Sequence, residues 1–261
     1  VFAGVGFKVL DNLSIGANIS YIYGDITHSV TTAFSNSSSF SSVRLDKISI
    51  NDYKLDFGLQ YSYKFNKKHV LNFGAVYSLG HSVNGKGYKY NQKWLNGADY
   101  PSTQTGDTIT NAFSLPHTFG AGLTYVYDNR LTIGADFTYQ QWEDAKFYNE
   151  KSYFSNRTKI AAGAEFVPNP YSRNYLKRVR YRVGGYYSDP YTKVDGQDGT
   201  REYGVSAGFG FPLFQSKSIL NISGQYVRVS PKVKGMLEEN YLKINIGLTF
   251  NERWFMKWKV D

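Results

Sequence analysis

Hydrophobic and polar residues alternate with a period of two along most of this chain. In the segment L131-T-I-G-A-D-F-T-Y139, every odd position is apolar or aromatic, and every even position is threonine, glycine or aspartate. Such alternation gives a β-strand one apolar face and one polar face. The distant segment L13-S-I-G-A-N-I-S-Y21 nearly repeats this pattern.

Eleven segments show the same alternation, and no helical periodicity of comparable length competes with them. They cover residues 3–9, 13–21, 53–63, 71–78, 118–127, 131–139, 159–166, 178–183, 202–211, 220–226 and 242–250. The fold class predicted from this pattern is all-β, with about eleven antiparallel strands in the chain.

The length of the apolar faces favours a transmembrane β-barrel over a soluble sandwich. Sandwich strands usually have about 5–6 residues, whereas a tilted strand needs about 9–11 residues to cross a bilayer. Tyrosines lie near both ends of the apolar faces, with Tyr21 and Tyr139 at one end and Tyr63 and Tyr127 at the other. Two aromatic girdles are typical of the two water–lipid interfaces of a barrel.

The charged residues decide which face meets lipid. Ten of them fall on the polar parity: Lys54, Asp56, Asp136, Lys159, Glu165, Arg178, Arg180, Arg182, Glu202 and Lys243. A lysine or arginine that faces lipid at the bilayer midplane costs about 2–4 kcal/mol. Ten such positions would exceed a folding free energy of about 5–15 kcal/mol, so we expect the polar parity to line a lumen.

Composition narrows the function classes. The chain of 261 residues has 23 Tyr, 18 Phe and 25 Gly but no cysteine, which excludes disulfides and thiolate metal sites. No apolar run is long enough for a transmembrane helix, and no signal-peptide pattern opens the sequence. The net charge is +9, yet no nucleic-acid-binding motif accompanies it, so we expect no nucleic-acid partner.

The connections alternate between short and long. Short turns follow the first, third, fifth and ninth segments, as at Asp11-Asn12, and a somewhat longer one follows the seventh. Long polar connections include residues 24–47, 80–108, 141–155, 189–201 and 230–240. Bacterial barrels place short turns in the periplasm and long loops outside. That orientation puts Val1 outside the cell, and the odd strand number then predicts that N-terminal strands are missing.

The chain divides into strands and loops over residues 1–250 and a C-terminal segment over residues 251–261. The second segment is either a periplasmic tail or a turn followed by a short twelfth strand.

Several hairpins resemble those of the FadL/OmpP1/TodX family of outer-membrane transporters. The resemblance rests on G4-V-G-F-K-V-L-D-N-L-S-I-G-A-N-I-S-Y-I-Y-G24, on T124-Y-V-Y-D-N-R-L-T-I-G-A-D-F-T-Y-Q-Q-W142, and on F166-V-P-N-P with Y181-R-V-G-G-Y-Y187. The ending N251-E-R-W-F255 looks like members from Bacteroidetes-type, Gram-negative bacteria.

This resemblance implies an outer-membrane, multi-pass barrel surrounded by membrane lipid and lipopolysaccharide. The family has fourteen strands and an N-terminal hatch, so the chain would correspond to its C-terminal part, the fourth to fourteenth strands. The hatch and the kinked early strand of the family are absent from this sequence, so no ligand contact is carried over.

Arg178, Arg180 and Arg182 form a candidate ligand-binding ladder on the polar parity. They would hold the carboxylate headgroup of a hydrophobic small-molecule ligand through charge-assisted hydrogen bonds. The alternative, which we favour, is that they pair with Glu165 and Glu202 on neighbouring strands, because buried charges are normally paired.

No arrangement of residues indicates catalysis, a cofactor or a metal. The four histidines have no metal-ligand spacing, and we take Ser114 and His117, a nearby Ser/His pair, as incidental. The many inward glycines leave room for a plug or ligand, or ease strand curvature. The connection 80–108, with Tyr88, Tyr90, Trp94 and Tyr100, is either a capture surface for amphiphiles or a self-packed cap.

Three functions follow from this interpretation. The first is passive uptake of long-chain fatty acids or other hydrophobic compounds. The second is a scaffold or shuttle role in an outer-membrane protein complex for secretion or assembly. The third is an aqueous porin. We expect bound lipid under the first, stable co-purifying chains under the second and a large conductance under the third.

Overall fold

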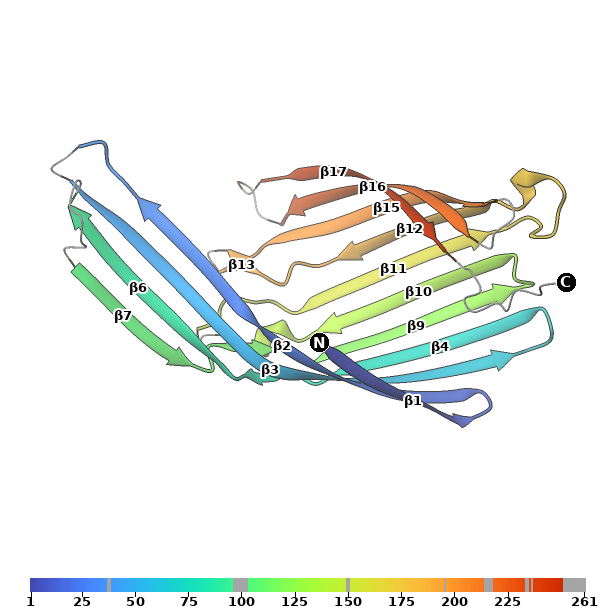
Figure 1. Cartoon of the computed structure of the whole chain (residues 1–261), viewed down its shortest axis with the longest axis horizontal. Coiled ribbons are helices and arrows are strands. Elements are labelled where there is room, and N and C mark those ends of the chain that lie inside the picture. The colour runs from blue at the N-terminus through green and yellow to red at the C-terminus, as the bar shows by residue number, and fades with distance from the viewer. Residues whose placement is uncertain are drawn as a thin grey trace, which may run out of the picture.

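Eleven long strands form one continuous antiparallel sheet in the computed structural model (Figure 1). The structure describes residues 1–36, 39–95, 103–148, 151–194, 196–213, 218–232, 235 and 237–250. The sheet order is β1-β2-β3-β4-β9-β10-β11-β12-β15-β16-β17. The strands are β1 (Phe2–Leu10), β2 (Leu13–Thr32), β3 (Phe40–Lys64), β4 (His69–Ser78), β9 (Thr118–Tyr127), β10 (Leu131–Gln140), β11 (Arg157–Phe166), β12 (Arg180–Ser188), β15 (Thr200–Pro212), β16 (Ile219–Pro231) and β17 (Glu239–Thr249).

These strands confirm the eleven predicted segments and the predicted fold class. Every neighbour in the sheet is antiparallel, and the pairs keep the parity of the sequence pattern. Ile133, for example, lies opposite Tyr125 on one side and Ala164 on the other. Because a shift of one residue would exchange the two faces, the alternating pattern itself specifies this register.

The apolar parity forms an exposed outer face. Phe57, Leu123 and Val205 are 48%, 48% and 61% exposed although each lies within a strand. Water would penalise such a continuous apolar surface, while lipid solvates it. The polar parity forms the opposite, inner face, as predicted.

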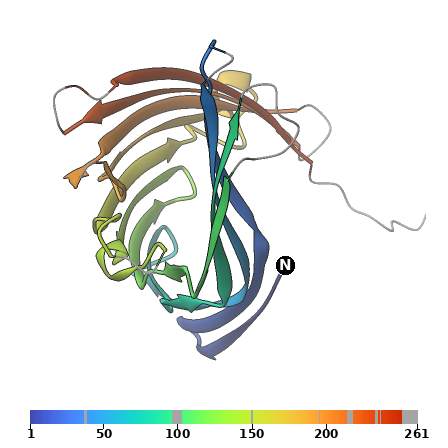
Figure 2. The ribbon, with the colours of Figure 1, turned by 90° about the vertical axis from the view of Figure 1, so that its left-hand side faces the viewer.

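The sheet curves into a trough rather than lying flat (Figure 2). Within the described residues, β1 and β17 are the two ends of the sheet order and do not pair with each other. The described helices, η1 (Trp142–Asp144) and η2 (Tyr175–Lys177), are single 3-10 turns. Neither they nor any other described helix is long and apolar enough to cross a membrane.

The two ends of the sheet differ in their connections. At the short-turn end, β1–β2 and β9–β10 are joined by residues 11–12 and 128–130, and β11–β12 are joined through η2. At the long-loop end, the connections carry further structure. Small pairs form there between β5 (His81–Val83) and β8 (Phe113–Leu115), and between β13 (Lys193–Val194) and β14 (Gln197–Asp198). Among the described connections, the short turns lie at one end of the sheet and the longer connections at the other, as predicted.

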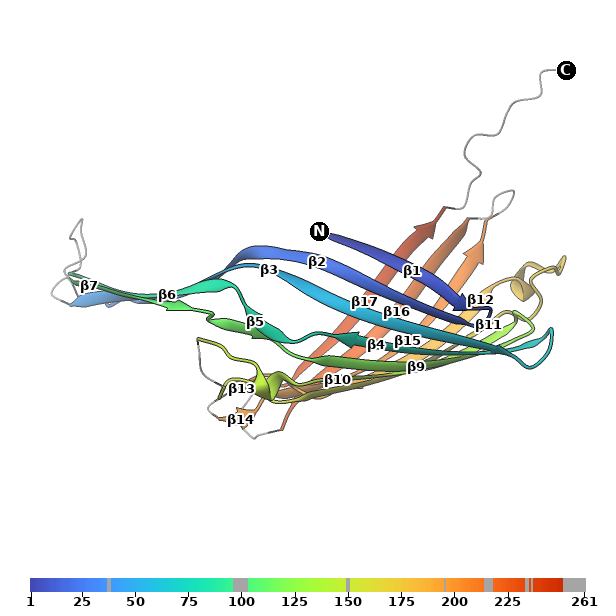
Figure 3. The ribbon, with the colours of Figure 1, turned by 90° about the horizontal axis from the view of Figure 1, so that it is seen from below.

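The largest difference from the prediction is a flat sheet that extends beyond the long-loop end (Figure 3). We call it the extension. It consists of residues 22–32 of β2, residues 40–52 of β3, β6 (Gly85–Leu95) and β7 (Thr103–Thr110), in the order β2-β3-β6-β7. The connections predicted at residues 24–47 and 80–108 are therefore largely strands, and the prediction of loops there was wrong.

Some predicted features lie outside the described residues. They are the C-terminal segment 251–261, the short turn predicted after the ninth segment, at residues 215–217, and Tyr100.

Candidate functional site

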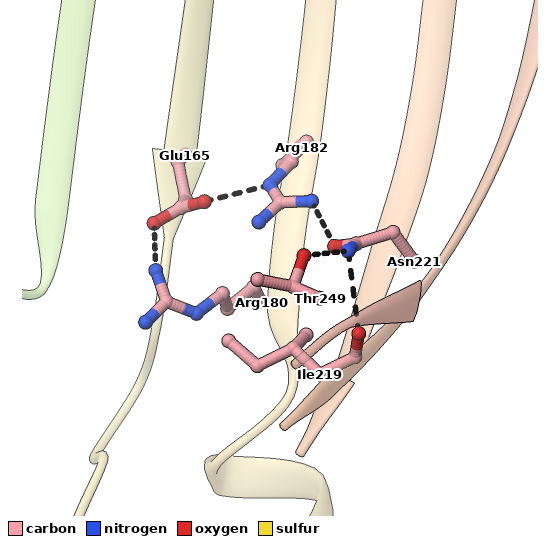
Figure 4. Close-up of polar contacts among 6 residues, drawn as sticks. All are labelled: Glu165, Arg180, Arg182, Ile219, Asn221 and Thr249. Carbon is pink, nitrogen blue, oxygen red and sulfur yellow. Dashed lines mark hydrogen bonds and ion pairs between the residues drawn. The ribbon is translucent and has the colours of Figure 1, made fainter. Parts of the chain in front are cut away.

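Two of the predicted arginines lie on the inner face near the short-turn end and share one carboxylate (Figure 4). Arg180 Nη1 donates to Glu165 Oε1 at 2.8 Å, and Arg182 Nε donates to Glu165 Oε2 at 2.6 Å. Arg182 Nη1 also donates to Asn221 Oδ1 at 2.7 Å, and the Asn221 amide donates to Thr249 Oγ1 at 3.2 Å. This chain of contacts joins β11, β12, β16 and β17.

The register explains why these side chains meet. Glu165 lies directly opposite Arg182, and Arg180 and Asn221 lie opposite Gly210 from its two sides. A Cβ at Gly210 would lie 3.2 Å from Arg180 Cβ and 3.3 Å from Asn221 Oδ1, so the glycine leaves room for both side chains. The Arg180 and Arg182 side chains remain 40% and 38% exposed. The contribution of these ion pairs to stability is therefore reduced by solvent screening.

Arg178 is not part of this network, so the predicted ladder has two strand positions instead of three. It follows η2 as the C-terminal cap residue in an α conformation, before β12 begins. Its guanidinium lies over the Tyr175 ring at 5.4 Å. The favoured pairing with acids is confirmed for Glu165, whereas Glu202 accepts a hydrogen bond from the Tyr186 hydroxyl instead.

The inner face between β1 and β10 is a shallow groove of about 690 Å³ lined mainly by small and uncharged groups. Gly58, Gly74 and Gly122 form part of its wall, together with Gln60 and Asn72. The predicted inward glycines therefore do line open space. Asp136 is the only carboxylate among the lining residues.

The base of the extension is held by a small apolar core. Ile48, Ala112 and Tyr148 are 1%, 0% and 6% exposed and pack together with Ile109. A Cβ at Gly87 would lie 2.8 Å from Ala112 Cβ and 2.9 Å from Tyr148 Cε1, so only glycine fits there. Burial raises the pKa of the Tyr148 hydroxyl. The extension is thus anchored to the loop between β10 and β11.

Beyond this base, the extension presents two faces and a long edge. On the outer parity, Tyr88 and Tyr90 stack with ring centroids 6.2 Å apart, and Trp94 follows on the same parity. Residues 22–32 of β2 pair with β3 on one side only. The predicted capture surface or cap is therefore a strand surface, and its role stays a prediction.

The loops of the long-loop end are tied together by one carboxylate. Asp198 accepts hydrogen bonds from Ser155 Oγ at 2.6 Å and from Lys232 Nζ at 2.9 Å. The Ser155 hydroxyl and the Lys232 ammonium hold the pKa of Asp198 below its ordinary value. Three connections, β10–β11, β12–β15 and β16–β17, meet at this point.

The Ser114/His117 pair has no catalytic geometry. Ser114 Oγ lies 3.3 Å from Ser82 Oγ, whereas His117 Nδ1 lies 2.8 Å from the Tyr77 hydroxyl. Over the part of the chain that the structure describes, no group of three or more histidine and carboxylate side chains is arranged to hold a metal ion.

The extension is the feature that the sequence pattern missed, although a weaker signal was present. Above Tyr21 the apolar residues of β2 change parity, to Ile22, Ile26 and Val30, and the outer parity is polar from Asp25 onward. Alternation therefore continues over residues 22–32 in the opposite sense, and the parity of the spanning strands alone predicts a loop there.

Comparisons with solved structures agree with the barrel architecture. A Pseudomonas aeruginosa FadL homologue is 17% identical with a TM-score of 0.54, and the match covers 88% of this chain and 59% of that chain. The Ralstonia pickettii toluene transporter TbuX is 13% identical with a TM-score of 0.55, covering 87% and 63%. The Pseudomonas putida toluene transporter TodX is 14% identical with a TM-score of 0.53, covering 95% and 67%.

At these identities the likeness shows the fold alone, which confirms that part of the predicted resemblance. The chain spans less than two thirds of the length of the FadL homologue and of TbuX. No curated protein matches the sequence. A family model named BamG matches residues 1–261. With its exposed apolar belt and FadL-like fold, the chain is an outer-membrane β-barrel protein, and it belongs to the BamG family.

Proposed function

We propose that this chain acts as a structural barrel subunit of the Bam complex, the scaffold role rather than the transport role. The observation that carries the proposal is the match of the BamG family model to the whole chain, residues 1–261. The family is one of Bam-complex components, so its other subunits are the partners that the proposal names.

The extension supports a role in protein interaction. It adds eleven residue pairs to the β2–β3 hairpin beyond Tyr21 and Tyr53, and β6 and β7 widen it to four strands. The part of the extension farthest from the barrel projects beyond the spanning strands as a single layer of sheet (Figure 3). A flat sheet with exposed edges and stacked tyrosines is suited to contact another protein, whereas passage of a small molecule through a barrel does not need it.

The inner face gives less support to transport of fatty acids. Both oxygens of Glu165 already occupy the guanidinium groups of Arg180 and Arg182. A carboxylate ligand would have to displace that internal ion pair to use these arginines. The transport role stays as the second candidate, because the groove of about 690 Å³ has room for a small hydrophobic molecule.

The test is affinity purification of the tagged chain from its native outer membrane, followed by mass spectrometry of the co-purifying chains. The informative variant lacks the extension but keeps every spanning strand. A two-residue Asn-Gly turn would join Tyr21 to Tyr53, which are cross-strand partners. A second such turn would join Val83 to Phe113, which are also partners.

We expect the intact chain to co-purify with Bam subunits and the shortened variant to lose them while it still inserts in the membrane. The matched control is Arg180→Gln with Arg182→Gln, which changes the inner face and leaves the extension intact, and it should keep the partners. Retention of all partners by the shortened variant, or a purified chain with bound fatty acid and no partner, would contradict the proposal.

A further inference from the structure

The net charge of the chain is gathered at one end of the sheet. Four connections of the short-turn end, with the strand ends beside them, carry ten Lys and Arg against three Asp and Glu. They are residues 8–11, 64–68, 128–130 and 165–182. All other described residues together carry fifteen Lys and Arg against thirteen Asp and Glu. The +9 charge of the sequence is therefore concentrated at the short-turn end.

The turn tips contribute the most accessible part of this charge. Lys67 and Lys68 lie in the β3–β4 turn, and Arg173 and Lys177 lie in the β11–β12 connection. All four are exposed. None of them forms an ion pair within the described ranges, so their charges face solvent without compensation.

The strand ends add cations on the inner face. Lys64 ends β3 and has the same parity as Gln60 of the groove wall. Arg180 and Arg182 share the single carboxylate of Glu165, which leaves that trio with a net positive charge. These cations continue the basic surface from the turn tips to the mouth of the trough.

Among the described residues at the same end, the outer parity carries no cation. Its last residues are aromatic, including Tyr63, Tyr127 and Tyr181. Lipid headgroups meet the outer face, where these tyrosines form the girdle. The phosphate groups of the bilayer therefore do not account for cations on the inner face. A polyanion that approaches from the aqueous side meets both groups of cations.

We propose that the short-turn end is a docking surface for an acidic polypeptide segment of a periplasmic protein. Barrels of this class place short turns in the periplasm. The β3–β4 and β11–β12 turns are separated by about four strand spacings, or roughly 20 Å at 4.7–4.9 Å each. An extended peptide of about six residues spans that distance at about 3.3 Å per residue. Alternate Asp or Glu side chains would then reach successive cationic turns.

The test uses the whole chain in nanodiscs of zwitterionic phosphatidylcholine. The probe is a fluorescein-labelled oligoglutamate of about twelve residues, and binding is followed by fluorescence anisotropy. We expect saturable binding that weakens steeply as the ionic strength rises from about 0.05 to 0.5 M, because exposed charges are screened. An oligoglutamine of the same length should not bind.

Two variants locate the surface. Lys67→Glu with Lys68→Glu, and separately Arg173→Glu with Lys177→Glu, should each lower the affinity for oligoglutamate by about tenfold. The matched control, Lys86→Glu with Lys93→Glu, makes the same change of charge on the extension and should stay within about twofold. All six side chains are exposed, four of them in connections and two in β6. Heat-modifiable gel mobility then checks that each variant is folded.

Three results would overturn the inference. One is an equal loss of affinity in the control variant. Another is the absence of saturable binding at low ionic strength. The third is a set of turn variants that bind oligoglutamate normally but lose the enrichment of phosphatidylglycerol that the unchanged chain shows in mixed phosphatidylcholine and phosphatidylglycerol nanodiscs, which would assign the surface to lipid headgroups. The inference goes beyond the proposed function and is tested separately from it. Binding of oligoglutamate tests the inference, whereas loss of Bam subunits on removal of the extension tests the proposed function, so either can fail without the other.

Discussion

The β2–β3 hairpin contains two regions that share strands and register but differ in their surroundings. In the lower region, Leu13–Tyr21 of β2 has its apolar residues on the outer parity. In the upper region, residues 22–32 have theirs on the inner parity. Pairing with β3 continues without interruption from one region to the other. The same backbone geometry therefore carries two opposite side-chain patterns.

The difference shows that the solvent, and not the strand, sets which parity is apolar. Lipid solvates apolar side chains on the outer face of the lower region. Beyond the aromatic girdle the outer face of β2 meets water, and the buried apolar core lies on the inner parity, where Ile48 packs against Ala112 and Tyr148. The change of parity near Tyr21 thus marks the membrane boundary along this hairpin.

The largest expected effect is in the core at the base of the extension. Ile48 and Ile26 are cross-strand partners on the inner parity, but Ile48 is 1% exposed and Ile26 is 52% exposed. Replacing Ile48 by Ala should cost about 2–5 kcal/mol in the local opening of the extension, because it leaves a cavity. Ile26→Ala should cost about 0.5 kcal/mol. Hydrogen exchange of the β6 and β7 amides measures both.

A result that would contradict this is unchanged protection of β6 and β7 in Ile48→Ala. It would mean that backbone pairing alone holds the extension.

A second substitution tests the change of solvent directly. Leu59 and Leu45 lie on the same strand and the same outer parity, one in the lower and one in the upper region. Leu59→Lys should destabilise the protein in lipid vesicles by about 2–4 kcal/mol, because it places an ammonium among lipid chains. Leu45→Lys should cost about 1 kcal/mol or less. Urea-induced unfolding in vesicles, followed by tryptophan fluorescence, gives both values.

Equal costs for the two leucines would break the comparison, since they would place both regions in the same solvent.

The smallest effect concerns pH and is confined to the loops outside the membrane. The lowered pKa of Asp198 means that its ties to Ser155 and Lys232 stabilise the loops at pH values above the ordinary value of 3.8, and are lost as the pH falls through the lower pKa of the folded state. Proteolysis of the β12–β15 connection should accelerate below about pH 4, with the spanning sheet unaffected. Asp198→Asn should abolish this pH dependence.

Much of the barrel could be predicted from local pattern alone. Parity identified all eleven spanning strands, the outer and inner faces, and the pairing of the inner arginines with Glu165, because each of these follows from period-two geometry and the cost of charge in lipid. Parity failed for Arg178, which caps η2 before β12 begins, and for the extension, where the apolar residues of β2 change face.

By itself, the sequence determined that the chain is a membrane-facing antiparallel sheet, since lipid imposes a single long-range rule on every spanning strand. Only the tertiary structure decided that two polar connections join as a four-stranded sheet, and that cations far apart in sequence collect at one end. The physical reason is that strand pairing and charge clustering depend on contacts between distant segments, whose loop-closure entropy and register no local window records.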